Sequence, residues 1–332
     1  MITWLWLLAL AVLVAAVAGS EKWQETVVAL LVVSAFIQAL FSHYVWWGGG
    51  GKILESGTFY APNQYAGFLL LLAPICLSLL FSSRDFLRTV LMIVVSTFVY
   101  GGIVLSGSRW GLVSAAIGGV VTLIAGRFRP RALLIRGAIL AAVLVGFLFL
   151  MTSRTVAPLY FEASGGSLLG PADAKGEGWL DGLELRLRWA RVAFDLGIER
   201  PLTGGGLGTF GDRHLELISP DDPWSKFAHN DYLEVFADLG ILGALAFFGF
   251  SGYVLRQGWR AARSRWANAW TAGLLGGLFG AALHVLLDHD WTYPAFGGAF
   301  VIASLMLLSG KNVSDSLSDA TRDGPKPVSR LR

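Results

Sequence analysis

The sequence predicts a helical transmembrane bundle, and three observations support this fold class. Hydrophobic residues make up 55% of the 332 residues and charged residues only 15%, whereas soluble domains carry about 25% charged residues. Apolar runs of about the length of a membrane span recur along the chain. The single cysteine, Cys76, excludes a disulfide scaffold, and a net charge of +3 is too small to indicate nucleic-acid binding.

Nine apolar runs define the predicted transmembrane helices. They lie at residues 3–18, 26–42, 63–81, 90–107, 110–125, 137–152, 233–255, 269–287 and 293–309. Most of them approach or reach the ~17–25 residues that a spanning helix needs. The first run has no basic leader, so we expect it to be retained, although Ala16-Val17-Ala18 resembles a signal-peptide cleavage site.

The charges of the connections predict the orientation, because Lys and Arg favour the cytoplasmic side. The segments 126–136 and 256–265 each contain four arginines and no acid. With nine spans, they fall on the same side as Arg84, Arg88 and the tail after Gly310. These stretches are therefore predicted to be cytoplasmic, and the N-terminus to lie outside.

Four regions follow from this topology. They are the first six helices (residues 1–152), an outer loop (153–231), the last three helices (232–309) and a disordered cytoplasmic tail (310–332). The loop contains eight basic and twelve acidic residues. Within it, helical periodicity predicts an amphipathic interfacial helix at 180–198, and the Gly-, Ser- and Ala-rich composition of 162–178 predicts a mobile segment.

Arginines near the membrane are the first candidate site residues, because ionisable groups at membrane depth are costly. Arg109 stands in Ser106-Gly107-Ser108-Arg109-Trp110, between two apolar runs. It either snorkels outward beside Trp110 or holds a guanidinium for phosphate oxygens. Arg186, Arg188 and Arg191 lie on the predicted interfacial helix and either face lipid headgroups or bind an anion. The glycine-rich turn 201–210 is a second place where backbone N–H groups could meet an anion, but it is no P-loop.

A histidine begins the next group of polar residues. His229 directly precedes an apolar run, so its imidazole lies at the membrane boundary and can act as a general base. Asn230 and Asp231 are typical of a helix N-cap. Asp231, Glu234 and Asp238 share one helix face near that N-terminus, where the helix dipole favours acids.

The last cluster contains His284, Asp288, His289 and Asp290. His284 and Asp288 are four residues apart, so a pair on one helix face is predicted. The spacing matches no standard zinc pattern, and no metal is expected. Farther upstream, Asn63 lies in a stretch of aromatic and amide residues that forms either an interfacial aromatic belt or a sugar-binding surface.

Four segments in this order resemble the O-antigen ligase/polymerase family of bacterial membrane glycosyltransferases. They are residues 57–67, 106–110, 186–210 and 229–233, and residues 284–294 resemble a further element. By this similarity Arg109 corresponds to an arginine that contacts a diphosphate, and His229 to an essential histidine. Arg186 corresponds to the arginine before a Pro-Leu-x-Gly motif. The family often has Arg-x-x-x-Trp here, and Trp189 is three residues after Arg186, so Arg186 or Arg188 can carry this role.

The resemblance implies a C-type glycosyltransferase in the bacterial inner (cytoplasmic) membrane. Its donor would be a glycan on a polyprenyl diphosphate such as undecaprenyl diphosphate. Its acceptor would be a hydroxyl of a glycan, of lipid A-core in lipopolysaccharide or of a protein, on the periplasmic or outer face. The implied site has His229 as base; Arg109, Arg186, Arg188 and Arg191 on the diphosphate; and Asn63, Asn230, Asp231, His284 and Asp288 in support. Because the donor is already activated, no nucleotide or other cofactor is expected.

Two other functional classes fit part of the pattern. A transporter or flippase of a polar lipid would place charged residues along a path through the bundle, whereas here they gather on one side. A non-catalytic assembly protein would use the outer loop as a partner surface. Such a protein has no need for Arg109 together with a histidine at the membrane edge.

Overall fold

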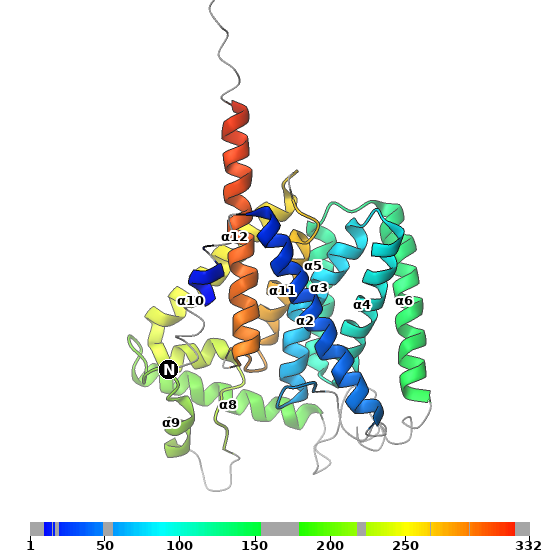
Figure 1. Ribbon diagram of the computed structural model, residues 1–332. Coiled ribbons are helices and arrows are strands. Elements are labelled where there is room, and N and C mark those ends of the chain that lie inside the picture. The colour runs from blue at the N-terminus through cyan, green and yellow to red at the C-terminus, as the bar shows by residue number, and fades with distance from the viewer. Residues whose placement is uncertain are drawn as a thin grey trace, which may run out of the picture.

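The computed structural model describes residues 10–14, 16, 20–48, 56–153, 179–217, 224–265, 267–291 and 293–322. The regular elements among these residues are α-helices, which form a bundle with α8 and α9 at one end (Figure 1). Their bounds are α2 (Glu21–Gly48), α3 (Pro62–Ser82), α4 (Phe86–Leu105), α5 (Arg109–Ala125), α6 (Pro130–Ser153), α8 (Trp179–Glu199), α9 (Phe210–Leu217), α10 (Asp231–Arg263), α11 (Thr271–His284) and α12 (Pro294–Arg322).

Most of the predicted membrane helices are present in the structure. Eight of the nine apolar runs coincide with α2–α6 and α10–α12, and the first run lies largely outside the described residues. Five helices, α2, α3, α4, α6 and α10, are long and apolar enough to cross a membrane. The apolar helices α5 and α11 and the apolar part of α12, Pro294–Ser309, are shorter. The chain is therefore a polytopic helical membrane protein.

The outer-loop predictions have a mixed outcome. Helix α8 confirms the helix that was expected at residues 180–198. The segment 162–178, which was predicted to be mobile, lies outside the described residues. At the C-terminus, α12 continues to Arg322, although a disordered tail was predicted from residue 310. Residues 311–322 contain neither Gly nor Pro, so nothing in the backbone chemistry stops the helix there.

The basic connections meet at one end of the bundle, opposite α8 and α9 (Figure 1). We call it the basic end; it contains the α3–α4, α5–α6 and α10–α11 connections. Arg136 Nη1 donates to the carbonyl of Leu80 at 2.7 Å, and Arg263 Nη1 donates to that of Ile124 at 3.1 Å. These carbonyls lie in the last turns of α3 and α5, where a helix leaves carbonyls without an internal partner and favours cations.

Helix α11 is the centre of the bundle, and glycines let its neighbours approach it closely. It packs mainly against α3 and α5. A Cβ atom added to Gly277 would lie 1.9 Å from the carbonyl oxygen of Leu71 in α3, and one on Gly276 would lie 2.3 Å from that of Gly118 in α5. Small residues at such contacts are the usual means of close helix packing in membranes. The position of α11, and of the turn that follows it, is therefore fixed by backbone contact.

This packing predicts a strong effect of side-chain size. We expect Gly276→Leu to destabilise the protein by about 1–3 kcal/mol, because the added atoms cannot be accommodated without moving α5. Gly137→Leu is the matched control, since nothing lies within 4 Å of a Cβ on Gly137. The measurement is the midpoint of thermal unfolding of both purified variants in detergent. Equal midpoints would contradict the packing described for α11.

Candidate active site

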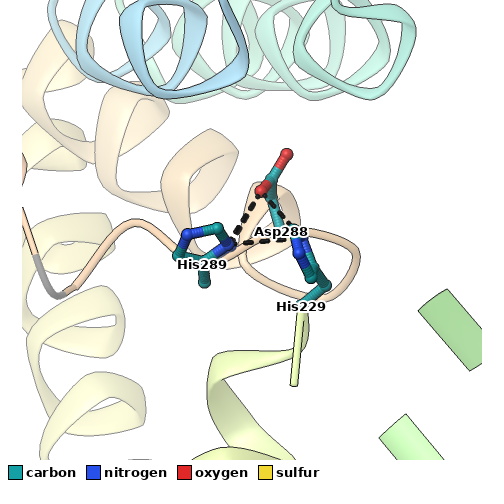
Figure 2. Close-up of side chains that lie close together, drawn as sticks. All are labelled: His229, Asp288 and His289. Atoms are coloured by element: carbon teal, nitrogen blue, oxygen red, sulfur yellow. Dashed lines mark hydrogen bonds and ion pairs between the residues drawn. The ribbon is translucent and has the colours of Figure 1, made fainter. Parts of the chain in front are cut away.

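The candidate site lies at the end of the bundle that carries α8, where three segments meet. One is the extended segment that leads into α10, the second is the turn between α11 and α12, and the third is α8 itself. Figure 2 shows that His229 comes from the first segment, whereas Asp288 and His289 come from the second. We call these three residues the histidine cluster.

Three short distances define the histidine cluster. His229 Nδ1 lies 3.4 Å from Asp288 Oδ1 and 3.2 Å from His289 Nδ1. His289 Nδ1 lies 3.4 Å from the same carboxylate oxygen. The side chain of Asp288 is only 3% exposed, so its carboxylate is shielded from water. The arrangement is that of an imidazole oriented by a buried acid.

The backbone at His229 is in an unusual conformation. Its φ is 50°, and it is the one non-glycine residue of the described chain with a positive φ. This left-handed conformation is disfavoured for residues that carry a Cβ, although histidine adopts it more often than most. Such conformations persist where the surrounding structure holds them, and they cluster at functional sites.

Aromatic rings enclose both histidines. The indole of Trp189 stacks on His229 with 4.8 Å between ring centroids, and Phe227 stacks on His289 at 4.2 Å. Tyr293 extends the cluster on the far side, because its hydroxyl lies 3.1 Å from His289 Nε2. Gln64 Nε2, at the start of α3, donates to the same hydroxyl. Asn63 was predicted to support the site, but the hydrogen bond to Tyr293 comes from the adjacent residue, Gln64.

The structure distinguishes between the arginines of α8. Arg186 Nη2 lies 3.7 Å from Asp288 Oδ2, which places its guanidinium beside the histidine cluster. Arg188 pairs instead with Glu184 on its own helix at 2.7 Å and is 59% exposed. Arg191 is also exposed. Of the two arginines that the sequence left open, Arg186 is the one at the site.

The predicted pair of His284 and Asp288 is wrong. Helix α11 ends at His284 and a turn follows, so the spacing of four residues no longer brings the two side chains onto one face. His284 Nδ1 pairs with Asp290 at 2.6 Å, and both side chains are fully buried. The carboxylate of Asp290 sits against Gly67 of α3, where an added Cβ would lie 2.5 Å from it. The pair of His284 and Asp290 therefore packs between the turn and α3, whereas Asp288 contacts the two histidines of the cluster.

The start of α10 fixes the other side of the turn. Asn230 caps α10 by accepting from Leu233 N at 3.0 Å, as predicted, and its Nδ2 donates to the carbonyl of Leu286 at 3.0 Å. Asp231 Oδ2 accepts from the backbone N–H groups of Asp290 and Trp291 at 3.0 and 3.2 Å. Both residues therefore position the loop that carries Asp288 and His289.

The glycine-rich turn has an internal anion. Gly208 N and Phe210 N both donate to the carboxylate of Asp238, so these backbone donors are satisfied by an acid of α10. Gly205 N donates to the carbonyl of Ala237 at 2.9 Å. That carbonyl lies just before Gly240, where a φ of 66° breaks the helix. The N–H groups of Gly208 and Phe210, which were predicted to meet an external anion, instead donate to Asp238. The turn therefore has a structural role, because it hydrogen-bonds to α10 next to the break at Gly240.

Arg109 begins α5, directly after the N-cap Ser108. The next residue, Trp110, donates its Nε1–H to the carbonyls of Leu283 and His284 at 2.9 and 3.1 Å. Arg109 is therefore placed next to the end of α11, where the turn of the site begins. Its side chain is half-buried.

Electrostatics in the cluster keep the imidazole neutral and the acid charged. Burial lowers the pKa of His229 below its ordinary value, against the opposing hydrogen bond with Asp288. Burial alone would raise the pKa of Asp288, but hydrogen bonds from His229 and His289 and the charge of Arg186 bring it well below its usual range. At neutral pH the cluster therefore contains a carboxylate beside a neutral imidazole, which is the state that a general base requires.

The same three residues form a group that could hold a metal ion. His229, Asp288 and His289 each offer one ligand atom, and these atoms all lie within 4.8 Å of one another. Two imidazoles and a carboxylate suit a divalent transition metal such as zinc.

Part of the chain is similar to a known protein family. Residues 92–248 match the family model described as O-antigen ligase. This part of the chain is similar to an O-antigen ligase domain. This match includes Arg109, Arg186 and His229, whereas the turn with Asp288 and His289 lies beyond its end. No curated protein matches the chain. This similarity to O-antigen ligases supports a membrane glycosyltransferase type of function for this polytopic protein.

The lowered pKa of His229 predicts its titration. In the full-length protein with 15N-labelled histidine, we expect the His229 signal to be mostly neutral at pH 6.5, because burial disfavours the imidazolium. Asp288→Asn should lower this pKa further, since the mutation removes a raising contact. Glu184→Gln is the control, because Glu184 pairs with Arg188 away from the cluster. The signal is assigned by its loss in His229→Gln, and a wild-type midpoint above 6.5 would contradict the assignment.

Proposed function

We propose that the protein transfers a glycan from a polyprenyl diphosphate to a hydroxyl acceptor, as an O-antigen or exopolysaccharide ligase or polymerase. The observation that carries this proposal is the set of contacts of Asp288, which joins the buried imidazole of His229 to the guanidinium of Arg186. The carboxylate of Asp288 thereby contacts both the proposed base for the acceptor hydroxyl, His229, and the proposed cation for the diphosphate, Arg186. The family match supports the reaction class.

His229 is the proposed general base. Its Nδ1 faces Asp288, so a proton on Nδ1 is held by the carboxylate and Nε2 carries the free lone pair. The acceptor oxygen attacks the anomeric carbon and forms the new glycosidic bond. The bond to the diphosphate breaks, its electron pair stays on the phosphate oxygen, and the acceptor proton moves to Nε2. Asp288 then stabilises the imidazolium that forms.

Arg186 and Arg109 are the proposed diphosphate ligands. The leaving group gains negative charge as the glycosidic bond breaks, and fixed guanidinium groups in a partly dry site stabilise it. Arg186 is 27% exposed, which leaves its donors accessible to a ligand while Asp288 holds it. Arg188 and Arg191 face outward and are assigned no direct role. The proposed mechanism needs no metal, because the arginines supply the positive charge.

An apolar groove beside the site supports a lipid-linked donor. It lies between α2, α3 and α12, and its cavity is about 450 Å³. Leu31, Phe68 and Ile302 are among its apolar lining residues, and Tyr293 is among its polar ones. Because Tyr293 also contacts His289, the groove adjoins the histidine cluster. From Tyr293 to Ile302 it follows α12 for about 13 Å at the ~1.5 Å rise per residue of a helix, and we place isoprene units there.

The proposed orientation follows from the basic end. Arginine-rich connections favour the cytoplasm, so the histidine cluster at the opposite end would face the periplasm of a bacterial inner membrane. A flippase is the weaker alternative, because among the described residues the ionisable groups of the candidate site gather at one end of the bundle. Glycan, lipid A-core and protein hydroxyls all fit the proposed chemistry as acceptors.

Substitutions of single residues test the proposal directly. We expect His229→Asn to lower glycan transfer by about 10²–10⁴-fold, because the general base is lost, while asparagine tolerates the left-handed backbone at this position. Arg186→Ala and Arg109→Ala should each lower it by about 10²-fold or more. The matched control is Arg188→Ala, which removes an exposed arginine of the same helix and should change the rate less than about twofold.

The assay uses purified full-length protein with a polyprenyl-diphosphate glycan and candidate acceptors, and it follows the glycosylated product. Equal unfolding midpoints of the variants would show that each one is folded. Wild-type product levels in His229→Asn would refute the role of the base. Equal losses in Arg186→Ala and Arg188→Ala would refute the assignment of Arg186.

Chelation separates the arginine mechanism from a metal mechanism at the same cluster. We expect EDTA treatment followed by gel filtration to leave the transfer rate within about twofold of the untreated protein, because charge stabilisation comes from guanidinium groups. Metal content of the same samples, measured by mass spectrometry, is the control. A lost rate that zinc restores would assign His229, Asp288 and His289 to a metal instead.

A further inference from the structure

A second polar cavity lies at the basic end, remote from the histidine cluster. Its volume is about 590 Å³, and it is formed by the end of α3, the α5–α6 connection and the first turns of α6. Five arginines line it: Arg84, Arg127, Arg129, Arg131 and Arg136. No carboxylate of the described residues lines this cavity. Nearby Asp85 uses its carboxylate to cap α4 by accepting from Arg88 N at 2.7 Å.

The loop that carries these arginines is anchored in the bundle. Phe128 packs on Phe81 of α3 with 5.7 Å between ring centroids and joins the hydrophobic core. Gly126 makes this possible, because a Cβ there would lie 2.1 Å from the Phe128 ring. Arg127 and Arg129 flank the anchored ring and are both exposed. The partly buried ring of Phe128 therefore holds Arg127 and Arg129 at the cavity.

Arg136 closes the cavity from the side of α6. Its Nη1 donates to the carbonyls of Leu80 and Phe81 at 2.7 and 3.3 Å, so this guanidinium is held in place. Arginines that served only to orient the chain in the membrane could be spread over the surface of the connections. Here residues from α3, from α6 and from the α3–α4 and α5–α6 connections converge on one concave surface, which is the arrangement of a binding site.

We propose that this cavity binds the phosphate headgroup of an anionic phospholipid from the cytoplasmic leaflet. Planar guanidinium groups donate to phosphate oxygens in pairs, and basic pockets between transmembrane helices on the cytoplasmic side suit such headgroups. Phe81, Phe128 and Ile135 give the cavity apolar walls, which fit the glycerol and upper acyl carbons of a lipid. A free phosphate would make no use of these walls.

The test is native mass spectrometry of the full-length protein titrated with cardiolipin, with phosphatidylcholine as the neutral reference. We expect Arg127→Gln/Arg129→Gln to weaken cardiolipin binding by about tenfold or more, because charge-assisted hydrogen bonds to phosphate are lost. Arg256→Gln/Arg260→Gln is the matched control. It removes two exposed arginines from the same end but outside the cavity, and it should change binding less than about twofold.

Cardiolipin binding by the cavity and control variants distinguishes a specific headgroup site from non-specific attraction. A tenfold loss confined to the cavity variant supports it, and Arg131→Gln serves as a second variant if the double variant has a lowered unfolding midpoint. Equal losses in the cavity and control variants would overturn it in favour of non-specific charge. Equal binding of phosphatidylcholine would also overturn it. Displacement of cardiolipin by inorganic phosphate at equal concentration would show that the ligand is a soluble anion.

Discussion

Hydrogen bonds between Asp231, at the start of α10, and the backbone of the turn after α11 hold the candidate site together. Asp231 accepts from Asp290 N and Trp291 N, and its own N–H donates to the carbonyl of Val285 at 3.0 Å. The residue is 3% exposed, so water does not compete for these bonds. His229 lies two residues before Asp231, and Asp288 lies within the tied turn. The hydrogen bonds of Asp231 therefore help to set the distance between His229 and Asp288.

The glycine contacts of α11 give the turn its rigid base. Gly276 and Gly277 bring α11 against the backbones of α5 and α3, so His284 at its end has little freedom to shift. His284 pairs with Asp290, and that pair lies beneath the residues that face His229. The turn after α11 is thus fixed both by the close packing of α11 against α3 and α5 and by the hydrogen bonds of Asp231.

The sequence was sufficient for the features that depend on local pattern. Apolar runs marked eight helices correctly, and the position of Asn230 before α10 marked its cap. The pair of His284 and Asp288 failed because four-residue spacing has meaning only inside a continuous helix, and α11 ends at His284. The choice between Arg186 and Arg188 depends on the rotation of α8 about its axis, which only its packing determines. Gln64 and Tyr293 meet across 229 residues, and no local signal reveals such a contact.

The division of the site between His229 and the turn near residue 288 has a consequence for biosynthesis. Arg109, Arg186 and His229 leave the ribosome before α11 and α12 are made, and His229 and Arg186 lack their contact with Asp288 until both helices have entered the membrane and packed. A nascent chain therefore contains no assembled histidine cluster. The cluster is complete only when the last two helices of the bundle pack, so its assembly coincides with the completion of folding.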